Sequence, residues 1–223
     1  MREKKLIGSS PPSPFSLGVV ILAAGRSRRM GQPKLLLPWG KTSVLGHLLK
    51  QWQSLSPEQI AVLCAEGDRA IQTELDQLDF PMQDRIFNLS PDRGMFSSIQ
   101  CASQWPGWKI DLTQWAIVLG DQPQLRRETL EAVLALARTN PQKVCQLKHN
   151  GHRRHPVLLP KQIFSDLAAS MAGNLKEFLA GYEGAFREVA DPGLALDIDH
   201  PEDYRQAVQL WRGTEHTEHG KKR

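Results

Sequence analysis

The feature that most constrains the fold is a regular alternation of short apolar runs with segments of helical spacing. Residues Leu17 to Ala23 form a continuous apolar run that includes Val19, Val20 and Ile21, as in a strand buried in a parallel sheet. The next segment, Ser43 to Trp52, instead places its apolar side chains three and four residues apart, which indicates a helix. Strands that alternate with helices in this way build βαβ units.

The same alternation continues along the chain. Further strands are predicted at Ile60–Cys64, Arg85–Phe87, Trp115–Leu119 and Ala195–Ile198, and further helices at Asp68–Leu78, Met95–Gln104, Arg127–Arg138 and from Pro201 onward. Two more strands, Lys143–Leu147 and Pro156–Leu159, flank Asn150-Gly151, a typical hairpin turn. We therefore expect the α/β class and a three-layer Rossmann-like fold: a mostly parallel, mixed sheet with helices on both faces.

Composition and charge place this fold in one domain. Residues 1–15 are rich in Ser and Pro and residues 213–223 are polar, so we predict a disordered lead-in, a domain at 16–212 and a disordered tail. The formal net charge of +4 lies entirely in the first five and last twelve residues, which leaves residues 6–211 neutral. A basic surface for nucleic acid is therefore not expected.

Cysteine spacing and hydropathy indicate the compartment. Cys64, Cys101 and Cys145 are far apart and form no Cys-x-x-Cys pair, which is typical of free thiols in a reducing environment. The longest apolar stretch, Val19 to Ala24, is too short to cross a bilayer, and residues 8–14 do not resemble the apolar core of a signal peptide. We expect a cytoplasmic protein without membrane association.

The loop after the first predicted strand carries the strongest functional signal. In a parallel sheet, ligands bind beyond the carboxyl ends of the strands. Small residues there let backbone N–H groups approach a polyanion, and clustered cations suit a triphosphate. The loop offers both, with the small residues Ala23, Ala24 and Gly25 after Leu22, and the cations Arg26, Arg28, Arg29 and Lys34 within nine residues. Composition alone leaves open the alternative that these cations are simply solvated side chains on a surface turn.

Two familiar phosphate loops are excluded. Gly-x-Gly-x-x-Gly is absent from this segment. Gly40-Lys41-Thr42 looks like the end of a P-loop, but Leu35 stands where that motif requires its first glycine. We expect Gly40-Lys41 to be an ordinary turn.

Three aspartates are candidate metal ligands. Asp121 directly follows the predicted strand Trp115–Leu119, so its carboxylate is expected in the ligand crevice. Asp197 and Asp199 alternate across Ile198 and would face the same side of a strand. Because Mg²⁺ takes oxygen ligands and usually keeps several waters, one or two carboxylates suffice, and the choice between Asp197 and Asp199 stays open.

Five segments, taken in order, resemble the MobA-like nucleotidyltransferases. They are Leu22–Lys34, Asn88–Ser98, Leu119–Pro123, His155-Pro156 and Leu196–Asp203, and the resemblance extends over about residues 18 to 210. Ala23-Ala24-Gly25 is most similar to the molybdenum cofactor cytidylyltransferase branch, whereas the guanylyltransferase branch has Ala-Gly-Gly. The resemblance implies Mg²⁺-dependent transfer of CMP from CTP to the phosphate of molybdopterin, with release of pyrophosphate.

The resemblance also implies roles for particular residues. The catalytic residues would be Lys34, Arg29 and Asp121. Lys34 and Arg29 would neutralise the β- and γ-phosphates and the departing pyrophosphate, and Asp121 would hold Mg²⁺. The nucleotide would be bound by Leu22, Ala23, Ala24, Gly25 and Lys34, with Gly94, Ser97 and Ser98 near the base and ribose, while His155 would face the acceptor. A plain helix start at Gly94 and a structural histidine remain the alternatives. The product would serve hydroxylases of the xanthine dehydrogenase type, so a molybdenum hydroxylase or its maturation chaperone is the expected partner.

Two departures from the family pattern concern the acceptor. The family usually has Gly-Asp-x-Gly-Ala, where this chain has Gly173-Asn174-Leu175-Lys176-Glu177, and Arg154 stands where glycine is preferred before His-Pro. A site built around the missing carboxylate would lose several kcal/mol if its donor stayed buried. We therefore expect normal nucleotide binding with altered acceptor affinity or identity. The competing functions are transfer to a sugar or polyol phosphate, and a non-catalytic molybdenum-cofactor chaperone.

Overall fold

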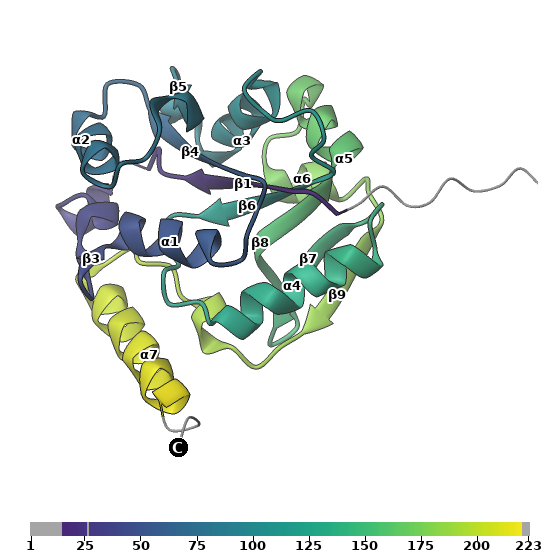
Figure 1. The fold of residues 1–223 in the computed structure, drawn as a ribbon. Coiled ribbons are helices and arrows are strands. Elements are labelled where there is room, and N and C mark those ends of the chain that lie inside the picture. The colour runs from purple at the N-terminus through teal and green to yellow at the C-terminus, as the bar shows by residue number, and fades with distance from the viewer. Residues whose placement is uncertain (1–14, 26, 220–223) are drawn as a thin grey trace, which may run out of the picture.

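A computed structural model describes residues 15–25 and 27–219, which form a seven-stranded sheet between two layers of helices (Figure 1). The strand order is β5-β4-β1-β6-β8-β7-β9. The strands are β1 (Leu17–Leu22), β4 (Gln59–Ala65), β5 (Arg85–Asn88), β6 (Gln114–Leu119), β7 (Val144–His149), β8 (His152–Pro160) and β9 (Gly184–Glu188). The expected α/β class and mixed, mostly parallel sheet are confirmed.

Strand direction explains where a ligand can bind. The central strand β1 pairs in parallel with β4 and β6, and β4 pairs in parallel with β5. Of the seven strands in the described sheet, β8 runs against the other six, because it is antiparallel to both β6 and β7. The predicted turn joins β7 to β8, with positive φ at Asn150 (52°) and Gly151 (76°), as such a hairpin requires. Strands β5, β4, β1 and β6 therefore end at a common edge.

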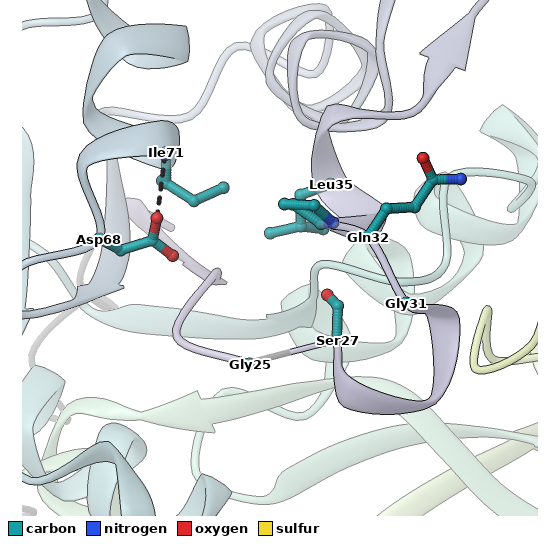
Figure 2. A pocket seen from close by; sticks show the side chains of 8 residues that line it. Gly25, Ser27, Gly31, Gln32, Leu35, Asp68 and Ile71 are labelled. Atoms are coloured by element: carbon teal, nitrogen blue, oxygen red, sulfur yellow. Dashed lines mark hydrogen bonds between the residues drawn. The ribbon is translucent and has the colours of Figure 1, made fainter.

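The α-helices are α1 (Val44–Gln53), α2 (Arg69–Gln77), α3 (Met95–Gln104), α4 (Arg127–Thr139), α5 (Lys161–Asp166), α6 (Leu175–Leu179) and α7 (Pro201–His219). Helices α1, α2 and α6 begin at residues whose side chains cap them. Ser43 Oγ accepts the Gly46 N–H at 2.9 Å ahead of α1, and Asp68 Oδ1 accepts the Ile71 N–H at 3.2 Å ahead of α2 (Figure 2).

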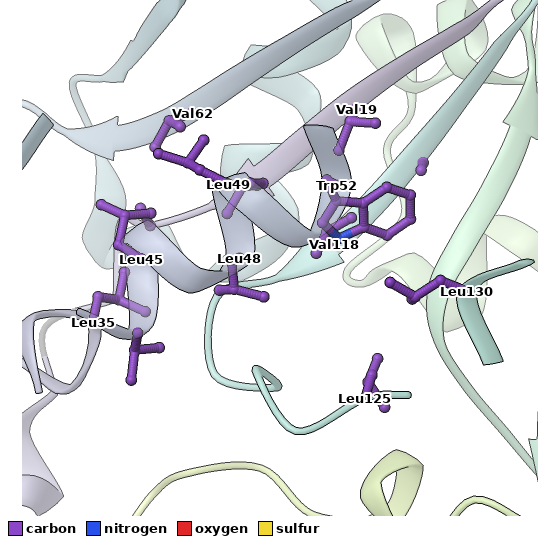
Figure 3. Close-up of a cluster of buried hydrophobic side chains, with 14 of the residues drawn as sticks. Val19, Leu35, Leu45, Leu48, Leu49, Trp52, Val62, Val118, Leu125 and Leu130 are labelled. Carbon is purple, nitrogen blue, oxygen red and sulfur yellow. The ribbon is translucent and has the colours of Figure 1, made fainter. Parts of the chain in front are cut away.

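Two apolar clusters bury the two faces of the sheet. Because successive strand residues point to opposite faces, Val19 and Ile21 lie in one cluster and Val20 lies in the other. Side chains of α1, α2 and α4 cover the first face; Figure 3 shows Leu45, Leu48, Leu49 and Trp52 of α1 with Val19, Val62, Val118 and Leu130. Side chains of α3, α5 and α6 cover the second. Each such fully buried side chain stabilises the fold by about 1.5–3 kcal/mol.

One predicted strand of the seven-stranded sheet is wrong, and one strand of that sheet was missed. Residues 195–198 form no strand; a short 3₁₀ helix spans Pro192–Ala195 and irregular chain follows. Backbone groups of residues 193–198 bond to the segment after β6. Gln124 Nε2 donates to the Gly193 and Leu196 carbonyls at 2.9 and 2.6 Å, and Ile198 N–H donates to Asp121 O at 3.1 Å. The seventh strand is instead β9, a short edge strand.

The ends of the chain are described in part. Helix α7 continues to His219, past the predicted domain end at residue 212, while residues 1–14 and 220–223 lie outside the described residues. The division into lead-in, domain and tail stays a prediction. Within the described residues, no helix has the length and apolar character needed to cross a membrane.

An aromatic cluster holds α7 against the rest of the domain. The rings of His47 in α1, Trp39 and Trp211 contact one another, with centroids 5.8 Å apart for His47 and Trp39, 5.6 Å for His47 and Trp211, and 5.2 Å for the two tryptophans. Trp39 belongs to the small hairpin of β2 (Pro38–Trp39) and β3 (Thr42–Ser43), whose Gly40 has φ of 60°, so the expected turn at Gly40-Lys41 is confirmed. Burial lowers the pKa of His47 to about 4.

This burial predicts a loss of stability in acid. The unfolded chain binds a proton at His47 below about pH 6.5, whereas the folded protein does so only below about pH 4, so acid favours unfolding. Between these values, His47 should remove up to about 3 kcal/mol of unfolding free energy. Urea titrations from pH 7 to 4 would measure the slope, and His47→Gln should flatten it. An equal slope in both proteins would contradict the assignment.

Candidate functional site

The candidate site lies where β1 and β6 end. Leu22 and Leu119, the last residues of these strands, are paired in register, so the loops that follow them lie side by side. Gly120 allows this close approach, because a Cβ there would lie 2.6 Å from the Leu22 carbonyl oxygen and 2.9 Å from Leu35. The structure therefore joins the basic loop to Asp121.

The basic loop folds back on itself. Ser27 and Gly31, with φ of 47° and 68°, flank a 3₁₀ turn at Arg28–Met30. The Lys34 N–H then donates to Ser27 Oγ at 3.1 Å, which returns Lys34 to the ends of the strands. Arg26 lies outside the described residues, so the cations of the loop that can be placed in the site are Arg29 and Lys34.

Four predicted site residues form a network of ion pairs. Lys34 Nζ lies 2.6 Å from Asp121 Oδ2 and 3.3 Å from Asp199 Oδ1, and Arg29 Nη2 lies 2.8 Å from Asp199 Oδ2. The Lys34 and Asp121 side chains are only 14% and 19% exposed, so solvent screens their attraction weakly. This network brings together positions that are up to 170 residues apart in the sequence, counted from Arg29 to Asp199.

Asp197 lies beside this network in a different role. Its Oδ1 accepts a hydrogen bond from Gln122 Nε2 at 2.8 Å. Burial raises the pKa of Asp197, and the negative charges of Asp121 and Asp199 raise it further. Gln122 thus orients one of the three predicted metal ligands. It is not among the site residues predicted from the sequence, although its position directly after Asp121 was a signal for such a role.

A divalent cation fits this set of carboxylates. Asp121 Oδ1 is buried and has no hydrogen-bond partner among the described residues, so it can accept a ligand. The Lys34 ammonium already shows that a cation can contact both Asp121 and Asp199. The described residues contain no group of three or more His, Cys, Asp or Glu side chains placed to hold a metal. An ion would thus be held by one or two carboxylates together with ligand oxygens, as Mg²⁺ commonly is.

A cavity of about 360 Å³ opens beside the ion pairs. It is lined by Leu22, Ala24, Gly25, Lys34 and Asp121 on one side and by Pro91, Asp92, Gly94, Met95 and Ser98 on the other. Ala23 does not line it, because its side chain is buried in the core and its N–H donates to Leu63 O at 2.7 Å. A second cavity of about 350 Å³ lies on the other side of the loop, lined by Gly25, Ser27, Gly31, Gln32, Leu35, Asp68 and Ile71 among others (Figure 2). Of these two cavities in the described part of the chain, the first is the one lined by Lys34 and Asp121.

The start of α3 forms the far wall of the first cavity. Asn88, the last residue of β5, donates through Nδ2 to Ser98 Oγ at 2.9 Å and to Ser97 Oγ at 3.2 Å. Ser97 Oγ also donates to Gly94 O at 2.8 Å. Ser98 and Gly94 line the cavity, whereas Ser97 supports the turn. Asn88 therefore orients both serines. Its position at the end of a predicted strand was the sequence signal that it could belong to the site.

His155, which is predicted to face the acceptor, lies in β8. Its Nδ1 is 3.2 Å from Ile117 O, and because a carbonyl oxygen only accepts, Nδ1 carries the proton and Nε2 is left as an acceptor in the neutral ring. Burial lowers the pKa of His155, although the hydrogen bond to Ile117 and the charge of Asp121 act in the opposite direction. His155 lines a third cavity, of about 780 Å³, together with Arg154 and Asn174.

The structure gives Asn174 a role that the sequence comparison did not foresee. Asn174 caps α6: its Oδ1 accepts the Glu177 N–H at 2.9 Å, while Glu177 Oε2 accepts the Gly173 N–H at 2.9 Å. Asparagine and aspartate cap a helix equally well. The donor facing Asn174 is thus satisfied, and the expected loss of several kcal/mol from the missing carboxylate does not follow.

The cap predicts a small, specific set of stability changes. Asn174→Asp should alter the unfolding free energy by less than about 0.5 kcal/mol, whereas Asn174→Ala should lower it by about 1 kcal/mol. Chemical denaturation of the three proteins would measure both differences. A larger loss for aspartate than for alanine would show that the amide N–H₂ group, rather than Oδ1, matters here.

Comparisons with known proteins bear on the family of this chain. The profile of the MobA-like NTP transferase domain matches residues 19–188. The molybdenum cofactor cytidylyltransferase of Escherichia coli (strain K12) is 25% identical over 197 residues, which cover 88% of this chain and 97% of that protein. The bifunctional protein GlmU of Pseudomonas syringae pv. syringae (strain B728a) is 35% identical over 134 residues, or 58% of this chain; the match spans only 27% of GlmU. The solved Rv0371c homologue from Mycobacterium sp. strain JC1 superposes with a TM-score of 0.69 at 27% identity, covering 88% of this chain and 97% of that one.

Proposed function

Because the chain belongs to the MobA-like NTP transferase domain family, we propose that it transfers CMP from CTP to the phosphate of a molybdopterin-type acceptor and releases pyrophosphate. The choice of acceptor rests on how much of each relative the sequence similarity covers. The similarity to the molybdenum cofactor cytidylyltransferase spans nearly the full length of both proteins, whereas the similarity to GlmU spans about a quarter of GlmU. A sugar or polyol phosphate is therefore the second candidate acceptor.

The network that joins Lys34 and Arg29 to Asp121 and Asp199 beside the first cavity is the observation that carries this proposal. In the reaction, an oxygen of the acceptor phosphate attacks the α-phosphorus of CTP. A new phosphoanhydride bond forms, the bond to the bridging oxygen of the β-phosphate breaks, and pyrophosphate leaves. Two anions must meet, so charge neutralisation and positioning dominate the catalysis.

Each residue has a place in this scheme. Lys34 and Arg29 supply fixed positive charge for the β- and γ-phosphates and for the pyrophosphate that leaves. Asp121, with Asp199, would hold Mg²⁺, which when bound offsets the charge that accumulates on the phosphate oxygens. His155 is placed to accept a hydrogen bond from the acceptor at Nε2. A protein that only carried the cofactor would not need this set of groups, which argues against the chaperone alternative.

The nucleotide preference is the next prediction. Ala24 lines the first cavity, and its Cβ occupies space that a glycine there would leave open for a larger base. CTP with Mg²⁺ should therefore stabilise the protein more than GTP or ATP in thermal melts. At about 100 times its dissociation constant, a ligand adds roughly 2.7 kcal/mol. Omitting Mg²⁺ is the control and should reduce the CTP effect, whereas an equal or larger shift with GTP would refute the preference.

The proposed product points to a partner and a compartment. Molybdopterin cytosine dinucleotide would be used by a molybdenum hydroxylase, so such an enzyme or its maturation chaperone is the proposed recipient, and the cytoplasm is the proposed location. Co-purification of the hydroxylase with this chain, dependent on bound product, is the corresponding measurement.

A further inference from the structure

The third cavity is built as an anion site. Its lining includes three cationic side chains, Arg153, Arg154 and Lys176, and no acidic residue among those described. Two carboxylates bonded close to the lining residues are engaged by backbone donors: Glu188 Oε1 accepts the Gly151 N–H at 3.3 Å, and Glu177 Oε2 accepts the Gly173 N–H. The first cavity, by contrast, contains aspartates as well as a lysine.

Arg154 is the central cation of this cavity. It is partly buried in β8, and its Nε is fully buried without a hydrogen-bond partner among the described residues. Arg154 forms none of the ion pairs found among the described residues, so the charge of its guanidinium is available to a bound anion. Arg153 is held nearby, with its guanidinium carbon 4.0 Å from the centre of the Phe186 ring. Lys176, in α6, is exposed on the opposite wall.

The cavity is also large and partly apolar. Its volume of about 780 Å³ is more than twice that of the first cavity and far exceeds the size of a phosphate group. Val157, Leu175 and Leu179, all buried, contribute apolar surface. A planar guanidinium next to apolar side chains suits a flat ring that carries negative charge.

The cavity adjoins the proposed site of chemistry. Met95, which is 47% exposed, lines both the first and the third cavity. A molecule in the third cavity can thus direct one end toward the CTP cavity while the rest stays near Arg154. The phosphate that is attacked must lie at that shared boundary, and the volume of about 780 Å³ leaves room for a further charged group beside Arg154.

We propose that the acceptor carries a second anionic group, distinct from the phosphate that receives CMP, and that Arg154 binds this group with Lys176 and Arg153 beside it. Arg154 is therefore a specificity-determining residue for acceptors with a planar, anionic ring system. This inference rests on the proposed function, because the proposed transfer is what places the reacting phosphate of the acceptor next to the CTP cavity.

A fluorescence titration with pterin-6-carboxylate tests the proposal without any turnover. The full-length protein should bind this planar anion, and the same ring without its carboxylate should bind more weakly. Arg154→Gln removes the charge at similar size and should weaken carboxylate binding about tenfold or more, while weakening the binding of the neutral pterin much less. Lys176→Gln should have a smaller effect in the same direction.

Controls separate this result from misfolding and from the proposed reaction. Arg187→Gln makes the same charge change on the exposed strand β9, outside the cavity, and should not alter binding. The thermal shift caused by Mg-CTP should be unchanged in Arg154→Gln. Equal binding of both pterins, or equal binding by wild type and Arg154→Gln, would overturn the inference. If molybdopterin fails as an acceptor while Arg154 still controls the binding of pterin-6-carboxylate, the proposed function is wrong and the anion site stands.

Discussion

Asp121→Asn is expected to lower the rate of nucleotidyl transfer by about a thousandfold, the upper range for loss of one electrostatic contact in an active site. The substitution keeps the size of the side chain but removes its charge. Asp121 Oδ2 contacts Lys34 Nζ at 2.6 Å, and its buried Oδ1 has no partner among the described residues, so both oxygens are available to cations. An amide would hold neither the ammonium nor Mg²⁺ with comparable strength.

The fold should survive this change, because Lys34 retains its contact with Asp199. Circular dichroism and the melting temperature would verify that. Asp68→Asn provides a matched control: Asp68 lies in the cavity on the other side of the loop and caps α2, where asparagine serves equally well. Its transfer rate should stay near that of the wild type. Retention of more than a tenth of the wild-type rate in Asp121→Asn would remove Asp121 from the mechanism.

Lys34→Ala is expected to raise the KM for CTP and to lower kcat, with a combined loss of about a hundredfold or more in kcat/KM. The ammonium is the cation that contacts both Asp121 and Asp199, and its side chain is only 14% exposed. Without it, fixed positive charge is lost at the phosphates, and two carboxylates face each other with less compensation.

Steady-state kinetics at saturating Mg²⁺ would separate the two parameters. Lys41→Ala is the matched control, because it removes the same charge from an exposed position in the turn between β2 and β3. It should leave both parameters unchanged. If Lys34→Ala responded to CTP as the wild type does, the basic loop would be an ordinary surface turn, the alternative that composition left open.

Much of the fold follows from local patterns. The buried strands β1, β4 and β6 have continuous apolar runs, and α1 has apolar residues at helical spacing, so each was predicted close to its observed bounds. Strand β9 has the sequence Gly-Ala-Phe-Arg-Glu at the edge of the sheet; its residues are half-buried or exposed, so they carry no clear apolar pattern. The region 195–198 has apolar residues typical of a strand, but Gln124 and Asp121 bond its backbone groups from another part of the chain.

The candidate site was predictable where it depends on strand ends. Parallel strands end at one edge, so Lys34 and Asp121 could be expected to meet, and the structure places them in contact. The partners within the site could not be foreseen, because they depend on tertiary contacts. The bond from Gln122 to Asp197 and the bonds from Asn88 to the two serines are of this kind. The capping role of Asn174 is local instead, and Asn followed by Glu three residues later was a sequence signal for it.

The most direct test of the account is transfer of label from CTP. The full-length protein is incubated with Mg²⁺, CTP labelled at the α-phosphate, and molybdopterin, and both labelled product and pyrophosphate are measured. One pyrophosphate should be released for each labelled dinucleotide formed, and only when both acceptor and Mg²⁺ are present. Label that appears on sugar or polyol phosphates but not on molybdopterin would contradict the proposed acceptor, and binding of CTP without labelling of any acceptor would contradict the proposed reaction.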